Sequence, residues 1–109
     1  MALFHPNPDQ LQMADVLHAF SDPQRLCIVR SLAKDPTPRR CGSFELDITK
    51  STLTHHFRVL REAGVIDQRE EGTARLNSLR RKDLDERFPG LLDAVLAGAP
   101  DPVTTAVSA

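Results

Sequence analysis

The segment that ends at Gly64 constrains the fold of this chain more than any other. Its large apolar residues recur at the spacing of one buried helix face: Leu53, Phe57 and Leu60. Asp47 or Thr49 can cap such a helix at its N-terminus, and Gly64 suits the position just past its last turn. The segment is therefore expected to be an amphipathic helix with defined ends.

The helical period stops after Gly64. Residues 65–70 and 73–79 are two short segments of extended character, separated by Glu71 and Gly72. Gly72 can adopt the positive φ that a tight turn between two strands requires. A hairpin is therefore predicted to follow the helix directly.

Two further helices are predicted upstream of this pair. Residues 7–20 can begin at Asn7 and Pro8, and their apolar stripe is Leu11, Ala14, Leu17 and Phe20. Residues 21–34 repeat the start signal with Asp22 as N-cap and Pro23 in the first turn. The second of these helices is apolar on most sides, which is typical of a helix buried between neighbours.

The C-terminal part predicts two short helical pieces and a tail. Residues 81–88 restart a helix that Asp83 can cap, the Pro89-Gly90 pair interrupts it, and residues 91–98 are apolar and helical in pattern. We expect one domain over residues 1–96 and a disordered tail over residues 97–109. The order of elements predicts a mainly α fold with a small β-hairpin, the winged helix-turn-helix.

Charge is distributed unevenly along the chain. Residues 50–82 hold eight basic and four acidic residues, whereas the remainder holds six basic and eleven acidic ones. A basic segment in a chain of net charge -1 indicates a face directed at a polyanion, or else an ordinary solvated surface. No apolar run approaches the roughly 20 residues that span a bilayer, and the N-terminus does not resemble a signal peptide. A cytoplasmic location is expected, and no nucleophile–base pair or phosphate-binding loop suggests an enzyme.

Helical geometry separates the two adjacent histidines of the segment before Gly64. If the stripe through Leu53 and Phe57 faces the core, His55 points away from the core and His56 lies at its edge, because successive residues are about 100° apart. The candidate DNA-binding residues of this helix are Lys50, Ser51, Thr52, Thr54, His55 and Arg58. Hydroxyl, imidazole and guanidinium groups bond base edges and phosphates. Arg69 and Arg75 of the hairpin are candidates for minor-groove or phosphate contacts.

The segments "FSDPQRLCIVRSLA" and "KSTLTHHFRVLREAGVIDQREEG" resemble the ArsR/SmtB family of bacterial winged-helix repressors. The resemblance covers residues 10–96. It implies a homodimer built from the first and last helices, an operator that is an imperfect inverted repeat of double-stranded DNA, and an effector that weakens DNA binding. In this family the effector is often a metal ion.

The sequence departs from the metal sites that the resemblance implies. The element before the DNA-reading helix holds one cysteine, Cys41, and the last helix offers Asp93 without a histidine. The remaining candidate ligands are His5 and His18, which would suit nickel or zinc. A small molecule, a redox event or a partner protein are alternative signals. A winged-helix module that binds protein and not DNA is the alternative function.

Overall fold

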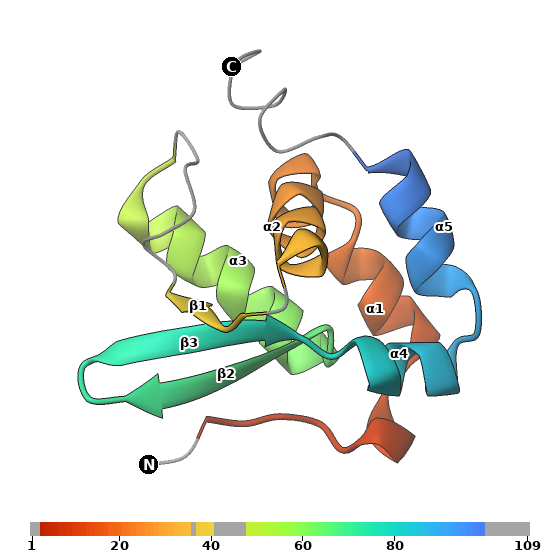
Figure 1. Cartoon of the computed structure of the whole chain (residues 1–109), viewed down its shortest axis with the longest axis horizontal. Coiled ribbons are helices and arrows are strands. Elements are labelled where there is room, and N and C mark those ends of the chain that lie inside the picture. Colours follow the sequence, from red (N-terminus) through yellow and green to blue (C-terminus); the bar gives the residue numbers. More distant parts are fainter. Residues whose placement is uncertain (1–2, 36, 41–47, 100–109) are drawn as a thin grey trace.

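Figure 1 shows helices packed over one side of a small antiparallel sheet, with a two-stranded hairpin extending beyond them. The computed structural model describes residues 3–35, 37–40 and 48–99. Its elements are η1 (Pro8–Gln10), α1 (Met13–Ala19), α2 (Pro23–Lys34), β1 (Arg39–Arg40), α3 (Lys50–Ala63), β2 (Ile66–Glu71), β3 (Ala74–Leu79), α4 (Arg81–Arg87) and α5 (Leu91–Gly98). The predicted mainly α fold with a hairpin is confirmed, and α3 followed directly by β2 and β3 gives the winged-helix arrangement.

Each of the five α-helices contributes to a single apolar core. Its buried side chains are Leu11, Val16, Ala19, Phe20, Ile28, Val29, Leu32, Phe57, Leu60, Ala63, Val65, Ile66, Leu84 and Leu92. Within the described residues, no helix combines the length and the apolar character that crossing a membrane requires.

The sheet has the strand order β1-β3-β2, and all its strands are antiparallel. In the hairpin, Gln68 faces Asn77, and Gly72 takes a φ of 63° in the turn, as predicted. The strand β1 was not predicted, because two residues are too few to show a period. It pairs its Arg39 with Asn77, on the other edge of β3.

The helix α3 begins and ends at residues that the sequence indicates. Thr49 is the N-cap, and its Oγ1 accepts a hydrogen bond from the backbone N–H of Thr52 at 3.2 Å. At the other end, Gly64 has a φ of 87°, and a Cβ built there would lie 2.0 Å from Leu11 Cδ2. Gly64 is therefore required both by the backbone turn and by the close approach of Leu11. Asp47, the other predicted cap, lies outside the described residues, as does Cys41.

The predicted helix over residues 7–20 is wrong in its length, and its predicted buried stripe is correct for Leu11 and Phe20 but not for Ala14 and Leu17. Leu11 and Gln12 are extended, with ψ of 129° and 133°, and they separate the short η1 from α1. The break restarts the helical period, so Val16 and Ala19 are buried while Leu17 is 47% exposed. Ala14, which was predicted to lie on the buried stripe, is exposed as well.

The C-terminal helices agree with the prediction except at one cap. Arg80 is the N-cap of α4, and it makes no side-chain capping bond, whereas Asp83 lies in the first turn. Instead, Arg80 Nε donates to Asp83 Oδ2 at 3.0 Å. The helix α5 extends to Gly98, and the predicted disorder of the tail falls mostly on residues 100–109, which lie outside the described part of the chain.

Candidate nucleic-acid interface

The N-terminal half of α3 presents a polar surface, because its apolar residues face the core. The six candidate residues of the helix are all exposed: Lys50, Ser51, Thr52, Thr54, His55 and Arg58. Behind them, Phe57 is buried and Leu53 is half-buried. The geometry therefore agrees with the helical phase that the sequence indicated.

Hydrogen bonds hold several hydroxyl groups of this surface in place. Thr49 Oγ1 donates to Thr52 Oγ1 at 2.8 Å and lies 3.3 Å from Ser51 Oγ. Thr54 Oγ1 donates to the carbonyl of Lys50 at 2.9 Å. The hydroxyls of Ser51, Thr52 and Thr54 each keep an acceptor lone pair for an incoming hydrogen-bond donor, whereas the groups around Thr49 Oγ1 engage both of its lone pairs.

The two adjacent histidines have different environments, as predicted. His55 is exposed, while His56 is 7% exposed and its ring is 6.1 Å from that of His55, centroid to centroid. Burial lowers the pKa of His56; the carboxylate of Asp22 opposes this effect, and Arg25 and His55 add to it. His56 Nδ1 lies 3.1 Å from Arg25 Nη1, which can only donate, so Nδ1 is the acceptor and the imidazole is neutral.

Arg25 joins three helices at this point. It donates from Nε to the carbonyl of Ala19 at 2.8 Å and from Nη2 to the carbonyl of His18 at 3.2 Å, both at the C-terminal end of α1. Its third nitrogen, Nη1, bonds His56 of α3. This role of Arg25 was not predicted from the sequence. One signal was present, because Arg25 lies three and seven positions before Ile28 and Leu32 and so falls on the buried face of α2.

The hairpin carries the two predicted wing residues, Arg69 and Arg75, and both are exposed. Arg69 pairs with Glu71 at 3.4 Å, on the same strand. No ion-pair partner of Arg75 occurs among the described residues. Glu70 is the cross-strand partner of Arg75 in the hairpin, but it makes no ion pair with it in the described part of the chain.

A buried polar chain connects α3 to both strands of the wing. Arg61 Nη1 donates to Gln68 Oε1 at 2.7 Å, and Gln68 Nε2 donates to Asn77 Oδ1 at 2.7 Å. These three residues are 7%, 3% and 0% exposed. Burial lowers the pKa of Arg61; Glu62 opposes this shift, and the positive charges of Arg75 and Arg58 add to it. Positive charge from the helix and from the wing therefore converges around Arg61.

The first residues of the chain form an N-terminal arm (residues 3–12) that runs along the base of the wing (Figure 1). Three arginines hold it by its backbone carbonyls: Arg61 Nε bonds Phe4 O at 3.1 Å, Arg80 Nη1 bonds Pro6 O at 2.8 Å, and Arg87 Nε bonds Leu11 O at 3.1 Å. The arm is thereby fixed to α3, to the end of the wing and to α4.

His5, one of the two candidate metal ligands, belongs to this arm. Its Nδ1 lies 3.0 Å from the carbonyl of Leu3, and its Nε2 accepts a hydrogen bond from the backbone N–H of Gln68 at 2.9 Å. Both ring nitrogens are thus engaged with the backbone. A metal ion bound by His5 would have to replace one of these contacts.

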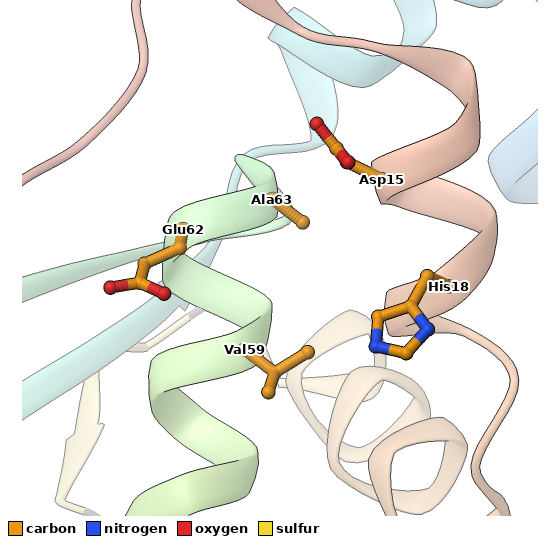
Figure 2. Close-up of a pocket in the computed structure, with 5 residues that line it drawn as sticks. All are labelled: Asp15, His18, Val59, Glu62 and Ala63. Atoms are coloured by element: carbon orange, nitrogen blue, oxygen red, sulfur yellow. The ribbon is translucent and has the colours of Figure 1, made fainter.

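His18, the other candidate, lines a groove of about 320 Å³ between α1 and α3. Figure 2 shows Asp15 and His18 on the α1 side, with Val59, Glu62 and Ala63 on the α3 side and the carboxylate of Glu62 turned away from α1. Within the part of the chain that the structure describes, His, Cys, Asp and Glu side chains form no group of three that could hold a metal ion. The groove brings His18 close to α3 without completing a ligand set.

Comparison with known proteins agrees with this architecture. Residues 22–68, which contain α2, α3 and the start of the wing, match the model of the bacterial regulatory proteins of the arsR family. The chain is 34% identical over 89 residues to the uncharacterized HTH-type transcriptional regulator YceK of Bacillus subtilis (strain 168), covering 80% of this chain and 88% of that protein. It is 38% identical over 61 residues to the uncharacterized HTH-type transcriptional regulator MJ1325 of Methanocaldococcus jannaschii, covering 55% of this chain and 68% of that protein. The prediction that the chain is not an enzyme is confirmed by these matches to transcriptional regulators, and the chain belongs to the ArsR family.

Proposed function

We propose that this DNA-binding transcriptional regulator is a homodimeric repressor that binds an imperfect inverted repeat and releases it in response to an effector. The observation that carries the proposal is the exposed polar surface of α3, which is followed directly by a hairpin with two exposed arginines, Arg69 and Arg75. Small hydroxyl side chains at the start of the helix permit close approach to a major groove. His55 and Arg58, one turn further on, can then reach base edges.

The proposed contacts divide into three groups. Ser51, Thr54, His55 and Arg58 would read base edges, and Lys50 with Thr52 would bind phosphate next to the helix N-terminus. Arg75 and Arg69 would bind the phosphates or the minor groove that flank the half-site. We expect Arg75 to contribute more than Arg69, because Glu71 lies 3.4 Å from Arg69.

The proposed dimer surface combines α1 and α5. On α1, Met13 and Leu17 are 44% and 47% exposed, although both are large and apolar. On α5, Leu91 and Val95 are half-buried. Of the apolar residues in segments 11–17 and 91–96, Leu11 and Leu92 are each 1% exposed in the protomer's own core and cannot contribute to this surface. A twofold axis at this surface would present the two copies of α3, the proposed recognition helix, to successive major grooves about 34 Å apart.

DNA binding is tested by selection from a random duplex library, followed by fluorescence anisotropy on the selected operator over a range of salt concentrations. We expect Arg58→Ala and His55→Ala each to weaken binding by about 1–3 kcal/mol. If Arg58 contacts phosphate, its variant also lowers the salt slope by about one. Glu62→Ala is the matched control, because Glu62 is exposed on the same helix and carries a negative charge. It should bind as well as the wild type or more tightly.

The same assay can refute the proposal. If the wild type selects no duplex and shows no salt-dependent affinity for DNA, the chain is a protein-interaction module. If the wild type binds but both α3 variants bind equally well, the surface is assigned wrongly.

The dimer and the effector need separate measurements. Sedimentation equilibrium should give a dimer for the wild type and a monomer for Leu17→Glu, because the charge would be buried in the interface. Nickel and zinc titrations of the operator complex test the metal hypothesis and the ligands His5 and His18. If neither metal changes the affinity for DNA, the signal is of another kind and the DNA-binding proposal is unaffected.

A further inference from the structure

The recognition helix must keep a fixed angle to the dimer helices if a dimer is to bind two half-sites at once. Apolar packing gives little directional control, because the hydrophobic effect depends on buried area and not on orientation. Hydrogen bonds are directional. Directional contacts that link α3 to α1 can therefore set this angle.

The guanidinium of Arg25 supplies such contacts. Two of its nitrogens bond the carbonyls of His18 and Ala19 at the C-terminal end of α1, at 3.2 and 2.8 Å. The third bonds His56 of α3 at 3.1 Å. Because the guanidinium is planar and rigid, fixing two of its nitrogens on α1 determines the direction in which the third reaches α3.

The other partners of this contact restrict it further. Asp22 caps α2 by accepting from the backbone N–H of Gln24 and Arg25, at 2.8 and 3.2 Å. The same carboxylate lies 4.0 Å from His56 Nε2, the nitrogen that carries the proton when Nδ1 accepts. Arg25 and His56 are 6% and 7% exposed, so water does not readily replace the bond between them.

We propose that Arg25 and His56 are positioning residues that fix the angle between the recognition helix and α1, and thereby the half-site spacing that the dimer accepts. The proposal rests on the proposed function, because it needs a dimer that contacts DNA through both recognition helices. Neither residue needs to touch DNA. The exposed His55 reads the groove, while the buried His56 orients the helix that carries it.

A twofold axis doubles the effect of any change in this angle, because both helices move. One base pair added at the centre of the operator separates the half-sites by roughly 3.4 Å and also rotates them. A dimer with a fixed helix angle discriminates between such operators, whereas a dimer with a loose angle discriminates less. The preference of the dimer for one half-site spacing therefore reports on how well the α3 helices are positioned. A lower fraction of folded protein weakens binding to all operators equally and leaves this preference unchanged.

The test uses the full chain and the operator that the wild type selects from a random duplex library, with two further duplexes that have one central base pair added or removed. We expect the wild type to prefer the selected spacing by at least about fivefold. His56→Leu should reduce this preference to less than about twofold, mainly by weakening binding to the selected spacing. His56→Asn should retain it, because the amide oxygen occupies the place of Nδ1 and accepts the bond from Arg25.

Val29→Ala is the matched control, because it opens a cavity at a fully buried position of α2 without touching this contact. It should weaken binding to all three duplexes by the same factor. A uniform loss with His56→Leu, or no change in its spacing preference, overturns the proposal.

Two further outcomes concern variants that do not fold and a wild type that does not bind DNA. If His56→Leu does not fold, Arg25→Gln replaces it in the same test, and failure of both to fold overturns the proposal, because the contact would then be required for the fold itself. If the wild type itself selects no operator, the proposed function fails before the variants are compared.

Discussion

Gly64 is the position where one added methyl group should cost this protein most. In Gly64→Ala the new Cβ would lie 2.0 Å from Leu11 Cδ2 and 3.2 Å from Pro6 Cγ. Leu11 is 1% exposed, so its side chain cannot move away without disturbing the core or the N-terminal arm. The residue must also keep a φ of 87°, which is unfavourable for alanine.

The expected loss of stability in Gly64→Ala is the sum of two effects. A left-handed backbone conformation costs a residue with a Cβ about 1–2 kcal/mol. Overpacking of a filled core costs about 1–3 kcal/mol. We expect Gly64→Ala to lower the free energy of unfolding by about 2–5 kcal/mol.

Gly72 provides the matched control. It has a φ of 63°, and no atom lies within 4 Å of a Cβ built there, so Gly72→Ala should show the backbone effect alone, about 1–2 kcal/mol. Urea unfolding followed by circular dichroism measures both, at one protein concentration because the stability of a dimer depends on concentration. A double-mutant cycle with Leu11→Ala isolates the steric part, because the shorter side chain removes the atom that the new Cβ meets.

Equal losses of stability for Gly64→Ala and Gly72→Ala would refute this reasoning. So would an undiminished cost of Gly64→Ala in the Leu11→Ala background. Either result would mean that the arm yields readily and that Leu11 does not require glycine at this position.

Three further predictions follow from the capping and charge contacts. Because folding lowers the pKa of His56 below its ordinary value of about 6.5, the unfolded chain binds the proton more tightly than the folded protein does. The contribution of neutral His56 to stability is therefore fully present above pH 6.5 and is lost as the pH falls toward the lowered pKa. Urea unfolding at a series of pH values should show this loss for the wild type, and His56→Asn should lack it. Asp22→Ala should lower the free energy of unfolding by about 0.5–2 kcal/mol, because it removes the cap of α2. Asp22→Asn can still accept the capping bonds and should cost less, so equal losses for the two variants would contradict the capping role. Arg81→Ala should change thermal stability little, by less than about 1 kcal/mol, because the Arg81 pairs with Asp85 and Asp93 lie in solvent; a larger loss in calorimetry would show that these pairs act as a network.

The elements that the sequence predicted correctly are those with local signals. Asp22 followed by Pro23 starts α2, Gly64 ends α3, and Gly72 turns the hairpin. The exposure of the candidate DNA-binding residues also followed locally, because the phase of α3 was set by Leu53 and Phe57. In each case the information lies within one or two turns of the residue concerned.

The parts that could not be predicted depend on contacts between distant segments. At the break before the first helix, the Leu11 side chain packs against Gly64, which is far away in the sequence. The pairing of Gln68 with Asn77 needs the hairpin register, and the bond from Arg61 needs the position of α3 above it. For Arg25, the period of α2 indicated burial, but its three acceptors belong to two other helices.

The N-terminal arm is held in place by hydrogen bonds to its main chain. Arg61, Arg80 and Arg87 all bond backbone carbonyls, which every amino acid provides. The arm can therefore change many of its side chains and keep its route, but it cannot easily change its length. Phe4 and Pro6 are two positions apart, the spacing at which an extended chain presents successive groups to one side. Losing or gaining one residue between them would turn a carbonyl away from its arginine, so related chains that keep this arrangement should tolerate substitutions in the arm far better than insertions or deletions.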